Sequence, residues 1–213
     1  MRHAIALFAT LLLGAQETVK LPVAATQGPS LASALQGRAT VRAFTAAGLT
    51  LAEAGQLLWA AQGENRPGKR TVPSARAKYP LEIYVVTAGS ADLAAGLYHY
   101  VPGGHKLARM DAAGPGALLG GIKGIQGWIP AAPAVFVVAG DPTRIEKSGT
   151  GPALSFTFYE AGAAAQALLL QATALGLGAG TAAGVDMDAV ASALKLPPGI
   201  RALVLLPAGH PKP

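Results

Sequence analysis

Residues 70–86 read Arg-Thr-Val-Pro-Ser-Ala-Arg-Ala-Lys-Tyr-Pro-Leu-Glu-Ile-Tyr-Val-Val, and the rest of the chain is interpreted around this stretch. Its first half is a Pro-Ser turn that carries the cations Arg76 and Lys78. After Tyr79-Pro80, an apolar run predicts a strand over 81–87. A cationic turn that leads directly into a buried strand places charged groups at the rim of a core. Because loops held on a rigid scaffold often carry function, we expect part of a functional site here.

The composition indicates one globular domain with a localised basic region. The chain has 213 residues, of which 51% are hydrophobic and 13% charged, and no linker divides it. Residues 38–78 hold seven Lys or Arg against two acids, which accounts for +5 of the net charge of +6. This excess is typical of a solvated basic face or of an anion-binding site. Nucleic-acid binding would need a longer basic stripe interleaved with aromatic residues, and only 6% of the residues are aromatic.

The N-terminus resembles a secretory signal. Met1-Arg2-His3 precedes ten nearly continuous apolar residues, 4–13, and small residues follow them. We therefore expect a signal peptide over 1–16 and export to the periplasm or the medium. The apolar run is too short to span a bilayer. A wrongly assigned start would instead leave the protein in the cytoplasm. Residues 17–30 read as a polar lead-in, and 31–213 as the folded domain.

A second segment, residues 38–44, alternates polar with apolar side chains. Arg38, Thr40 and Arg42 would point one way and Val41 the other. Two guanidinium groups that flank a hydroxyl suit a phosphate, because arginine offers planar, bidentate donors. Arginines engaged in surface salt bridges would give the same pattern.

The hydrophobic pattern predicts a mixture of helices and strands without regular βαβ alternation. One helix, 51–62, begins at the capping box Thr50-Leu-Ala-Glu53. Another, 159–177, is apolar nearly all round, which is typical of a core helix or of one shared with a second subunit. Its polar interruptions argue against a membrane span. Further helices are expected over 31–36, 117–125 and 187–195, a loop over 64–70, and strands over 81–87, 96–100, 106–110, 134–139 and 202–206.

Several familiar sites are excluded by the residues themselves. The absence of cysteine removes disulfides, thiolate ligands and cysteine nucleophiles. None of the four histidines has metal-ligand spacing, so no metal is expected. The glycines of 176–180 follow a helix and not a strand, which argues against a Rossmann site. Ser74 lacks the GxSxG elbow of a hydrolase.

Five motifs occur in order over most of the domain: Arg38–Phe44, the block Pro73–Val86, Gly96–Tyr100, Ala132-Pro133 before a strand, and Ala161–Gly184. Together they resemble the nitroreductase-like flavoproteins, most closely the SagB-type dehydrogenases, which include azoline oxidases. The resemblance covers about residues 31–210. It implies an α+β fold with a mainly antiparallel sheet wrapped by helices, and an intertwined homodimer with one FMN at each interface. The helix over 159–177 would be the central interface helix.

At the phosphate end, the resemblance implies that Arg38, Thr40 and Arg42 would meet the FMN phosphate and ribityl chain. Ala39 stands where this branch commonly has a second Arg or Lys. The family often has a further phosphate-binding cation well beyond its last strand, and Lys212 would take its place here.

At the ring end, the resemblance implies that Pro73, Ser74 and Ala75 would lie along the isoalloxazine ring. Ala183 and Gly184 would offer backbone N–H groups near N5 and O4. Arg76 replaces the glycine that is usual after this motif, so it would close the pocket or recruit an acidic substrate. Reduction places negative charge near N1 and O2 of the ring, and a nearby cation would stabilise that charge.

Three functions follow from these residues. The first is an FMN oxidoreductase that takes hydride from NAD(P)H and reduces a nitro, quinone or similar small-molecule acceptor. The second is a flavin dehydrogenase that forms a C=N or C=C bond in a substrate or peptide, with Lys78 and Tyr79 as its catalytic pair. The third is a family member without catalytic activity that binds a flavin, another ligand or a partner in the same pocket.

Overall fold

The computed structural model describes residues 17–213, and the expected signal peptide over 1–16 lies outside the described residues. Its centre is a seven-stranded sheet with the order β1-β6-β5-β4-β7-β9-β8, in which every neighbouring pair is antiparallel. A separate β2-β3 hairpin stands apart from this sheet. The strands are β1 (Thr18–Lys20), β2 (Glu64–Arg66), β3 (Lys69–Arg70), β4 (Leu81–Thr87), β5 (Gly96–Val101), β6 (Lys106–Asp111), β7 (Ala134–Gly140), β8 (Gly178–Ala179) and β9 (Arg201–Gly209).

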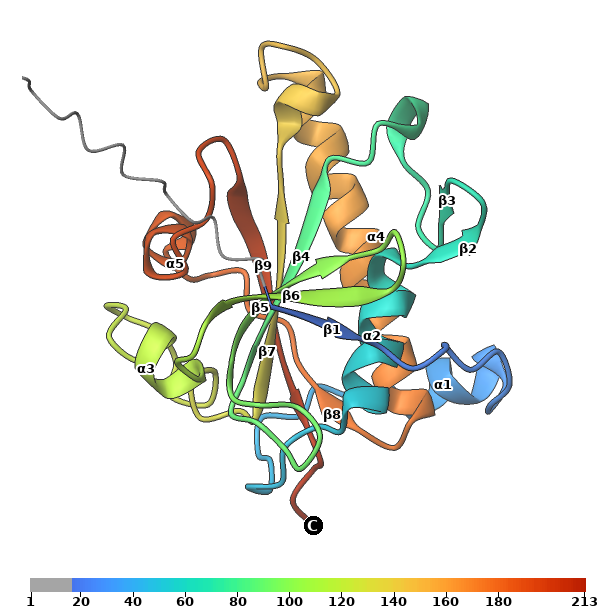
Figure 1. The fold of residues 1–213 in the computed structure, drawn as a ribbon, viewed down its shortest axis with the longest axis vertical. Helices are drawn as coiled ribbons and strands as arrows, with labels where there is room; N and C mark the ends of the chain where they lie inside the picture. Colours follow the sequence, from blue (N-terminus) through green and yellow to red (C-terminus); the bar gives the residue numbers. More distant parts are fainter. Residues whose placement is uncertain (1–16) are drawn as a thin grey trace, which may run out of the picture.

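Helices cover both faces of the sheet, so the predicted α+β fold is confirmed. Figure 1 shows α2 and α4 on one side of the sheet and α3 and α5 on the other. Ile83 and Val85 of β4 pack toward the first layer, and Tyr84 and Val86 toward the second, as the two-residue period of a strand requires. The helices are α1 (Leu31–Gly37), α2 (Leu51–Gln62), α3 (Pro115–Leu119), α4 (Pro152–Ala174) and α5 (Met187–Ala193), with single turns η1 (Ala75–Ala77) and η2 (Pro142–Arg144).

The long helix α4 begins seven residues before the predicted start at 159. Pro152 occupies its first turn, where the missing N–H costs nothing. The helix ends in a Schellman motif, in which Leu177 N–H donates to Ala172 O at 2.8 Å and Gly176, at φ 72°, donates to Thr173 O. The predicted end at 177 was therefore three residues too late.

The other differences from the sequence predictions concern short elements, namely three short strands and the helix α3. The polar lead-in contributes β1, an edge strand paired with β6. The expected loop 64–70 forms the β2-β3 hairpin, with Gly68 at φ 67° in its turn. α3 starts and ends earlier than 117–125, because Pro115 begins it and Gly120 follows its last residue. Among residues 17–213, no helix is both long and apolar enough to cross a membrane.

Candidate functional site

The segment 38–44 forms an arm along the β8 edge of the sheet and not a regular strand. Thr40 makes a single parallel bridge with Ala179, and Val41 N–H donates to Ala179 O at 3.0 Å. A Cβ on Gly178 would lie 2.6 Å from the Val41 side chain, so glycine is what permits this approach. The edge of the sheet therefore fixes the direction of the arm between its two arginines.

The chain's last residues lie on the other side of this arm. Phe44 bridges to Pro211, and Lys212 N–H donates to Ala43 O at 3.1 Å. The predicted phosphate-binding cations, Arg38, Arg42 and Lys212, therefore belong to adjacent backbone segments. In the part of the chain that the structure describes, none of the three forms an ion pair with a carboxylate. Together they form a basic end that is free to bind an anion.

Trp128 is a neighbour of this basic end that the sequence did not single out. The Arg42 guanidinium carbon lies 5.6 Å from the centre of a Trp128 ring. The indole N–H donates to Gln126 Oε1 at 2.7 Å. A Cβ on Gly180 would approach the same indole to 3.0 Å. Trp128 therefore forms an aromatic wall beside both the arm and the strand that leads to Ala183.

Groove 1, of about 550 Å³, runs along one side of α4. Ala183 lines it, and no hydrogen bond within residues 17–213 engages the N–H of Ala183 or of Gly184. Open space surrounds the position of a Cβ on Gly184. These two donors are therefore available to a ligand. The groove is lined by Phe158, Ala161, Gly162, Ala165, Gln166 and Leu169 of α4, Thr181, Ala183, Met187 and Asp188 after β8, and Arg201, Ala202, Leu203 and Val204 of β9.

Groove 2, of about 520 Å³, lies beside the Pro73–Ala75 bend. Its other lining residues are Ser155, Phe156, Tyr159 and Glu160 of α4. Phe156 and Tyr159 are 46% and 70% exposed, so the groove has an aromatic border. The bend meets α4 here, and the contact is made with an acid that the sequence analysis did not select as a site residue.

Glu160 is that acid, and it is only 1% exposed. Its Oε1 accepts from Ser74 Oγ at 3.0 Å and from Ala75 N–H at 2.7 Å, while Oε2 is buried without a partner. Burial raises the pKa of Glu160 above its usual value, against the hydrogen bonds from Ala75 and Ser74 that lower it. A lone carboxylate in an otherwise apolar helix was the available signal, because such an acid is seldom buried without a role.

We expect Glu160→Gln to be more stable than the wild type above the ordinary glutamate pKa of about 4.3. The folded-state pKa is raised, so the stability that the neutral carboxyl contributes is complete below the unfolded pKa and is lost as the pH rises through the folded value. Glutamine keeps the oxygen acceptor and stays neutral. The melting temperatures of the variant and the wild type, measured from pH 4 to pH 8, should differ more as the pH rises. A difference that stays constant or grows toward low pH would contradict the raised pKa of Glu160.

The turn after Ala75 is strained. Arg76, Ala77 and Tyr79 have φ angles of 53°, 53° and 46°, in the left-handed region that non-glycine residues avoid. Ser74 Oγ accepts from Tyr79 N–H at 2.8 Å and so closes the turn. Arg76 and Lys78 are exposed and form no ion pair within residues 17–213.

Neither Lys78 nor Tyr79 lines groove 1 or groove 2. The Tyr79 hydroxyl donates to Gly68 O at 3.4 Å, and Arg70 lies 5.3 Å above its ring. The tyrosine ring is therefore engaged with the β2-β3 hairpin. The catalytic role predicted for this pair stays a prediction.

Arg76→Gly should stabilise the protein, because glycine adopts φ 53° without a Cβ penalty. We expect a gain of roughly 0.5–1 kcal/mol, after allowance for the greater freedom of glycine in the unfolded chain. For a domain of this size, the melting temperature would rise by about 1–4 °C. Differential scanning calorimetry checks this, with Arg66→Gly in β2 as a control that should lose stability; a lower melting temperature for Arg76→Gly would show that strain does not dominate.

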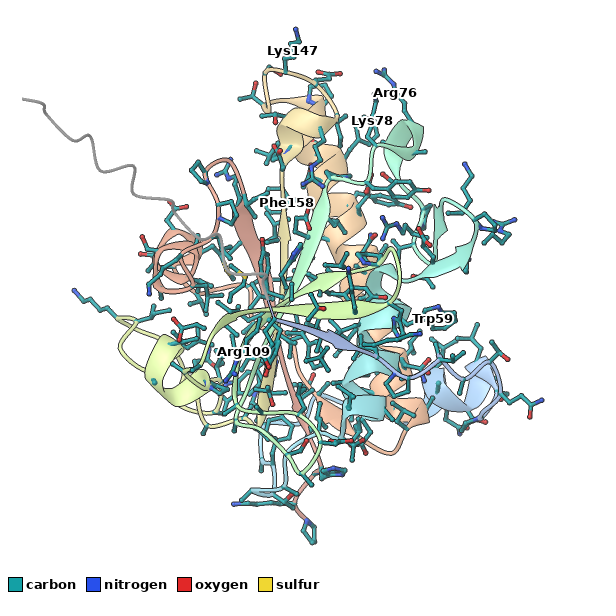
Figure 2. All side chains as sticks on the ribbon, viewed as in Figure 1. Trp59, Arg76, Lys78, Arg109, Lys147 and Phe158 are labelled. Atoms are coloured by element: carbon teal, nitrogen blue, oxygen red, sulfur yellow. The ribbon has the colours of Figure 1, made fainter. Side chains whose placement is uncertain are left out.

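The predicted site residues form two groups that one chain does not bring together. Arg76 and Lys78 stand at the upper end of the molecule (Figure 2), whereas the C-terminus, next to Lys212, lies at the lower end (Figure 1). A Cβ on Gly37, just before Arg38, would lie 3.3 Å from Thr173 near the end of α4, while the Ser74 bend touches Glu160 near its beginning. Within one chain, the bend and the arm therefore lie near opposite ends of α4, and the shared flavin site predicted for these residues stays a prediction.

The chain belongs to the Nitroreductase family, which its residues 35–210 match. It is 31% identical over 157 residues to a provisionally assigned nitroreductase of Methanocaldococcus jannaschii, with 72% of this chain and 78% of the relative covered. The crystal structure of another provisionally assigned nitroreductase, from Ralstonia eutropha, superposes with a TM-score of 0.81 at 27% identity and covers 92% of this chain and 90% of that one.

A more distant similarity shows the fold alone. The structure of the Escherichia coli microcin synthetase McbBCD complex, with truncated pro-MccB17 bound, contains a chain with a TM-score of 0.70 at 19% identity. The match covers 100% of this chain and 85% of that one. Family membership places the protein among oxidoreductases of a family that generally binds flavin.

Proposed function

We propose that the protein is an FMN-dependent oxidoreductase that transfers two electrons as a hydride from NAD(P)H to a nitro, quinone or similar small acceptor. The observation that carries this proposal is the basic end: Arg38, Arg42 and Lys212 lie on adjacent segments without a carboxylate partner among residues 17–213. Unpaired guanidinium groups beside a glycine-lined edge suit the phosphate of a mononucleotide.

The donor set also fits the rest of FMN. Arg38, Arg42, Lys212 and the Thr40 hydroxyl would hold the phosphate and the ribityl chain, and the N–H groups of Ala183 and Gly184 would donate to the polar edge of the ring. When bound, the flavin supplies the hydride chemistry. The chain's own residues orient the ring, keep water from it and place cations near it. No side-chain acid or base is required of the chain for direct hydride transfer.

The two groups of site residues support a site shared between two copies of the chain. The Ser74 bend touches α4 at Glu160, and the segment before Arg38 touches it at Thr173. An antiparallel crossing of two α4 helices midway between these points, near Gln166-Ala167, would bring each bend opposite the other copy's arginine arm. The α4 surface around this midpoint carries small or short side chains, including Gly162 and Ala163, which permit close packing.

Exposed apolar side chains support the same interface. Phe156, Phe158 and Tyr159 project from the first half of α4, and Leu31 and Leu35 from α1 beside its second half. Large apolar side chains gathered on one face of a monomer mark an interaction surface. In the proposed homodimer, each FMN would lie between the arginine arm of one copy and the Pro73–Ala75 bend of the other.

The test is the absorbance spectrum of the purified protein. We expect bound oxidised flavin, released as FMN on denaturation, and bleaching by NADH or NADPH that a nitroarene or quinone reverses. Colourless protein whose melting temperature FMN does not raise would remove the flavin from the proposal and favour the non-catalytic alternative. FMN that is bound but not reduced by either nicotinamide would remove the proposed electron donor.

A second candidate is a SagB-type dehydrogenase that oxidises a substrate or peptide to form a C=N or C=C bond. The fold shared with the microcin synthetase structure, which has truncated pro-MccB17 bound, is compatible with this alternative. Lys78 and Tyr79 would then be the catalytic pair. Lys78→Ala and Tyr79→Phe should each slow anaerobic flavin reduction by the substrate; unchanged rates would exclude them from that role.

Export remains part of the proposal. The signal peptide proposed over 1–16 implies that the mature protein starts near residue 17, and FMN would be bound outside the cytoplasm unless the folded protein is exported. N-terminal sequencing of the protein from fractionated cells tests this, and recovery of an intact Met1 from the cytoplasm would contradict it.

A further inference from the structure

Glu160 differs from every other carboxylate that the structure describes. It is the only Asp or Glu among residues 17–213 that is buried, and it ties α4 to a turn on the surface. Its Oε1 alone receives both hydrogen bonds from the turn. Burial of a carboxyl is costly, so its retention here points to a task at this position.

Hydrogen bonds link Glu160 directly to the start of the turn, at Ser74 and Ala75, and through Ser74 Oγ to its end at Tyr79. Ser74 Oγ donates to Glu160 Oε1 and accepts from Tyr79 N–H, so one hydroxyl connects the carboxyl to the first and the last residue of the turn. Within the turn, Arg76, Ala77 and Tyr79 have left-handed backbone angles. Such residues persist only where their surroundings hold them. The turn therefore depends on the α4 carboxyl for its shape.

The turn in this shape exposes two cations beside an aromatic groove. Arg76 and Lys78 project at the outer end of the molecule (Figure 2) and form no ion pair within residues 17–213. Ala75, next to Arg76, lines groove 2 together with Phe156 and Tyr159. In the proposed dimer the flavin ring lies beside the Pro73–Ala75 bend, so a flat, negatively charged acceptor at the ring would come close to these two cations.

We propose that Glu160 is a positioning residue that holds Arg76 and Lys78 where they select anionic aromatic acceptors over neutral ones. This role rests on the proposed flavin function, because the acceptor must reach the reduced ring. Glu160 acts through Ser74 and the turn and does not touch the acceptor. The charges that face the acceptor are those of Arg76 and Lys78, and salt screens exposed charges of this kind.

The experiment compares 4-nitrobenzoate with 4-nitrobenzamide, which has nearly the same shape without the charge. Their dissociation constants are measured by quenching of flavin fluorescence in the oxidised holoprotein, and their kcat/KM values in turnover. We expect a preference for the benzoate of roughly 3–10-fold at low ionic strength that declines with added salt. Arg76→Gln and Lys78→Gln together should bring the ratio near one.

Variants of the hydrogen bonds test the positioning role. Glu160→Gln keeps an oxygen acceptor for Ser74 and Ala75 and should keep the preference, whereas Glu160→Ala should lose it. Ser74→Ala removes the hydrogen bonds of this hydroxyl to Glu160 and Tyr79 and leaves the one from Ala75 N–H to Glu160. It should also reduce the preference, which keeps the test available if Glu160→Ala does not fold. Gln56→Ala is the matched control, because Gln56 is a buried polar residue that fixes Ala25 by two hydrogen bonds on the α2 side. This variant should be less stable than the wild type but keep the same preference for 4-nitrobenzoate over 4-nitrobenzamide.

Each outcome has a distinct meaning. A flavin-containing wild type that does not prefer the benzoate overturns this inference and leaves the proposed function intact. A preference that survives in both Glu160→Ala and Ser74→Ala overturns the positioning role. A colourless wild type removes the proposed function, and this inference with it, before any acceptor is added.

Discussion

Replacing Arg38 and Arg42 together with alanine is expected to abolish tight FMN binding and leave riboflavin binding unchanged. Both arginines lie on the arm that β8 and the C-terminal residues hold in place, and neither has a carboxylate partner among residues 17–213. A hydrogen bond to a charged group contributes about 1.5–3 kcal/mol. Loss of two should weaken FMN binding on the order of 10²–10⁴-fold, since 1.4 kcal/mol corresponds to tenfold.

Riboflavin provides the internal control, because it has the same ring and lacks the phosphate. Fluorescence titration of the apoprotein with each compound gives both dissociation constants. Lys20→Ala is the matched control variant, since Lys20 lies on β1, at the opposite edge of the sheet from β8. Equal losses of affinity for FMN and riboflavin in the double variant would mean that the arginines stabilise the fold and do not bind the phosphate.

The elements that local signals define were predicted from the sequence. α2 begins and ends as predicted because the Thr50–Glu53 capping box and Gly63 mark both of its ends. β4 matches its prediction because a mostly apolar run, rich in β-branched and aromatic residues, lies between Pro80 and Ala88 and is interrupted only by Glu82 and Thr87. β1 was missed because three residues at an edge owe their strand conformation to pairing with β6, which the local pattern does not encode.

The candidate site shows the same division between local and distant information. The Pro73–Ala75 bend and the arm over Arg38–Arg42 could be found because turn residues and charge alternation are local signals. The hydrogen bonds of Glu160 to Ser74 and Ala75 span 86 and 85 residues, and the contact of Arg42 with Trp128 is similarly distant. The predicted helix 159–177 started seven residues too late, and the pattern did not show that α4 separates the bend from the arm.

A mixed dimer of two inactive variants should regain about half of the flavin, and this result would establish a site shared between copies. The first variant carries Arg38→Ala with Arg42→Ala, which damages the arm. The second carries Ala75→Phe, which fills groove 2 beside the bend. In the proposed dimer, each homodimer has two damaged sites. The mixed dimer has one site with both changes and one site with neither.

The two variants are produced together with different affinity tags, and the mixed dimer is isolated by two successive purifications. We expect about one FMN per two chains and close to half of the wild-type turnover, because the two sites lie on opposite sides of the symmetry axis. A site built within one chain would leave both sites of the mixed dimer damaged and the protein colourless. Since the bend touches α4 at Glu160 and the segment before the arm touches it at Thr173, recovery of flavin requires the bend and the arm to come from different copies.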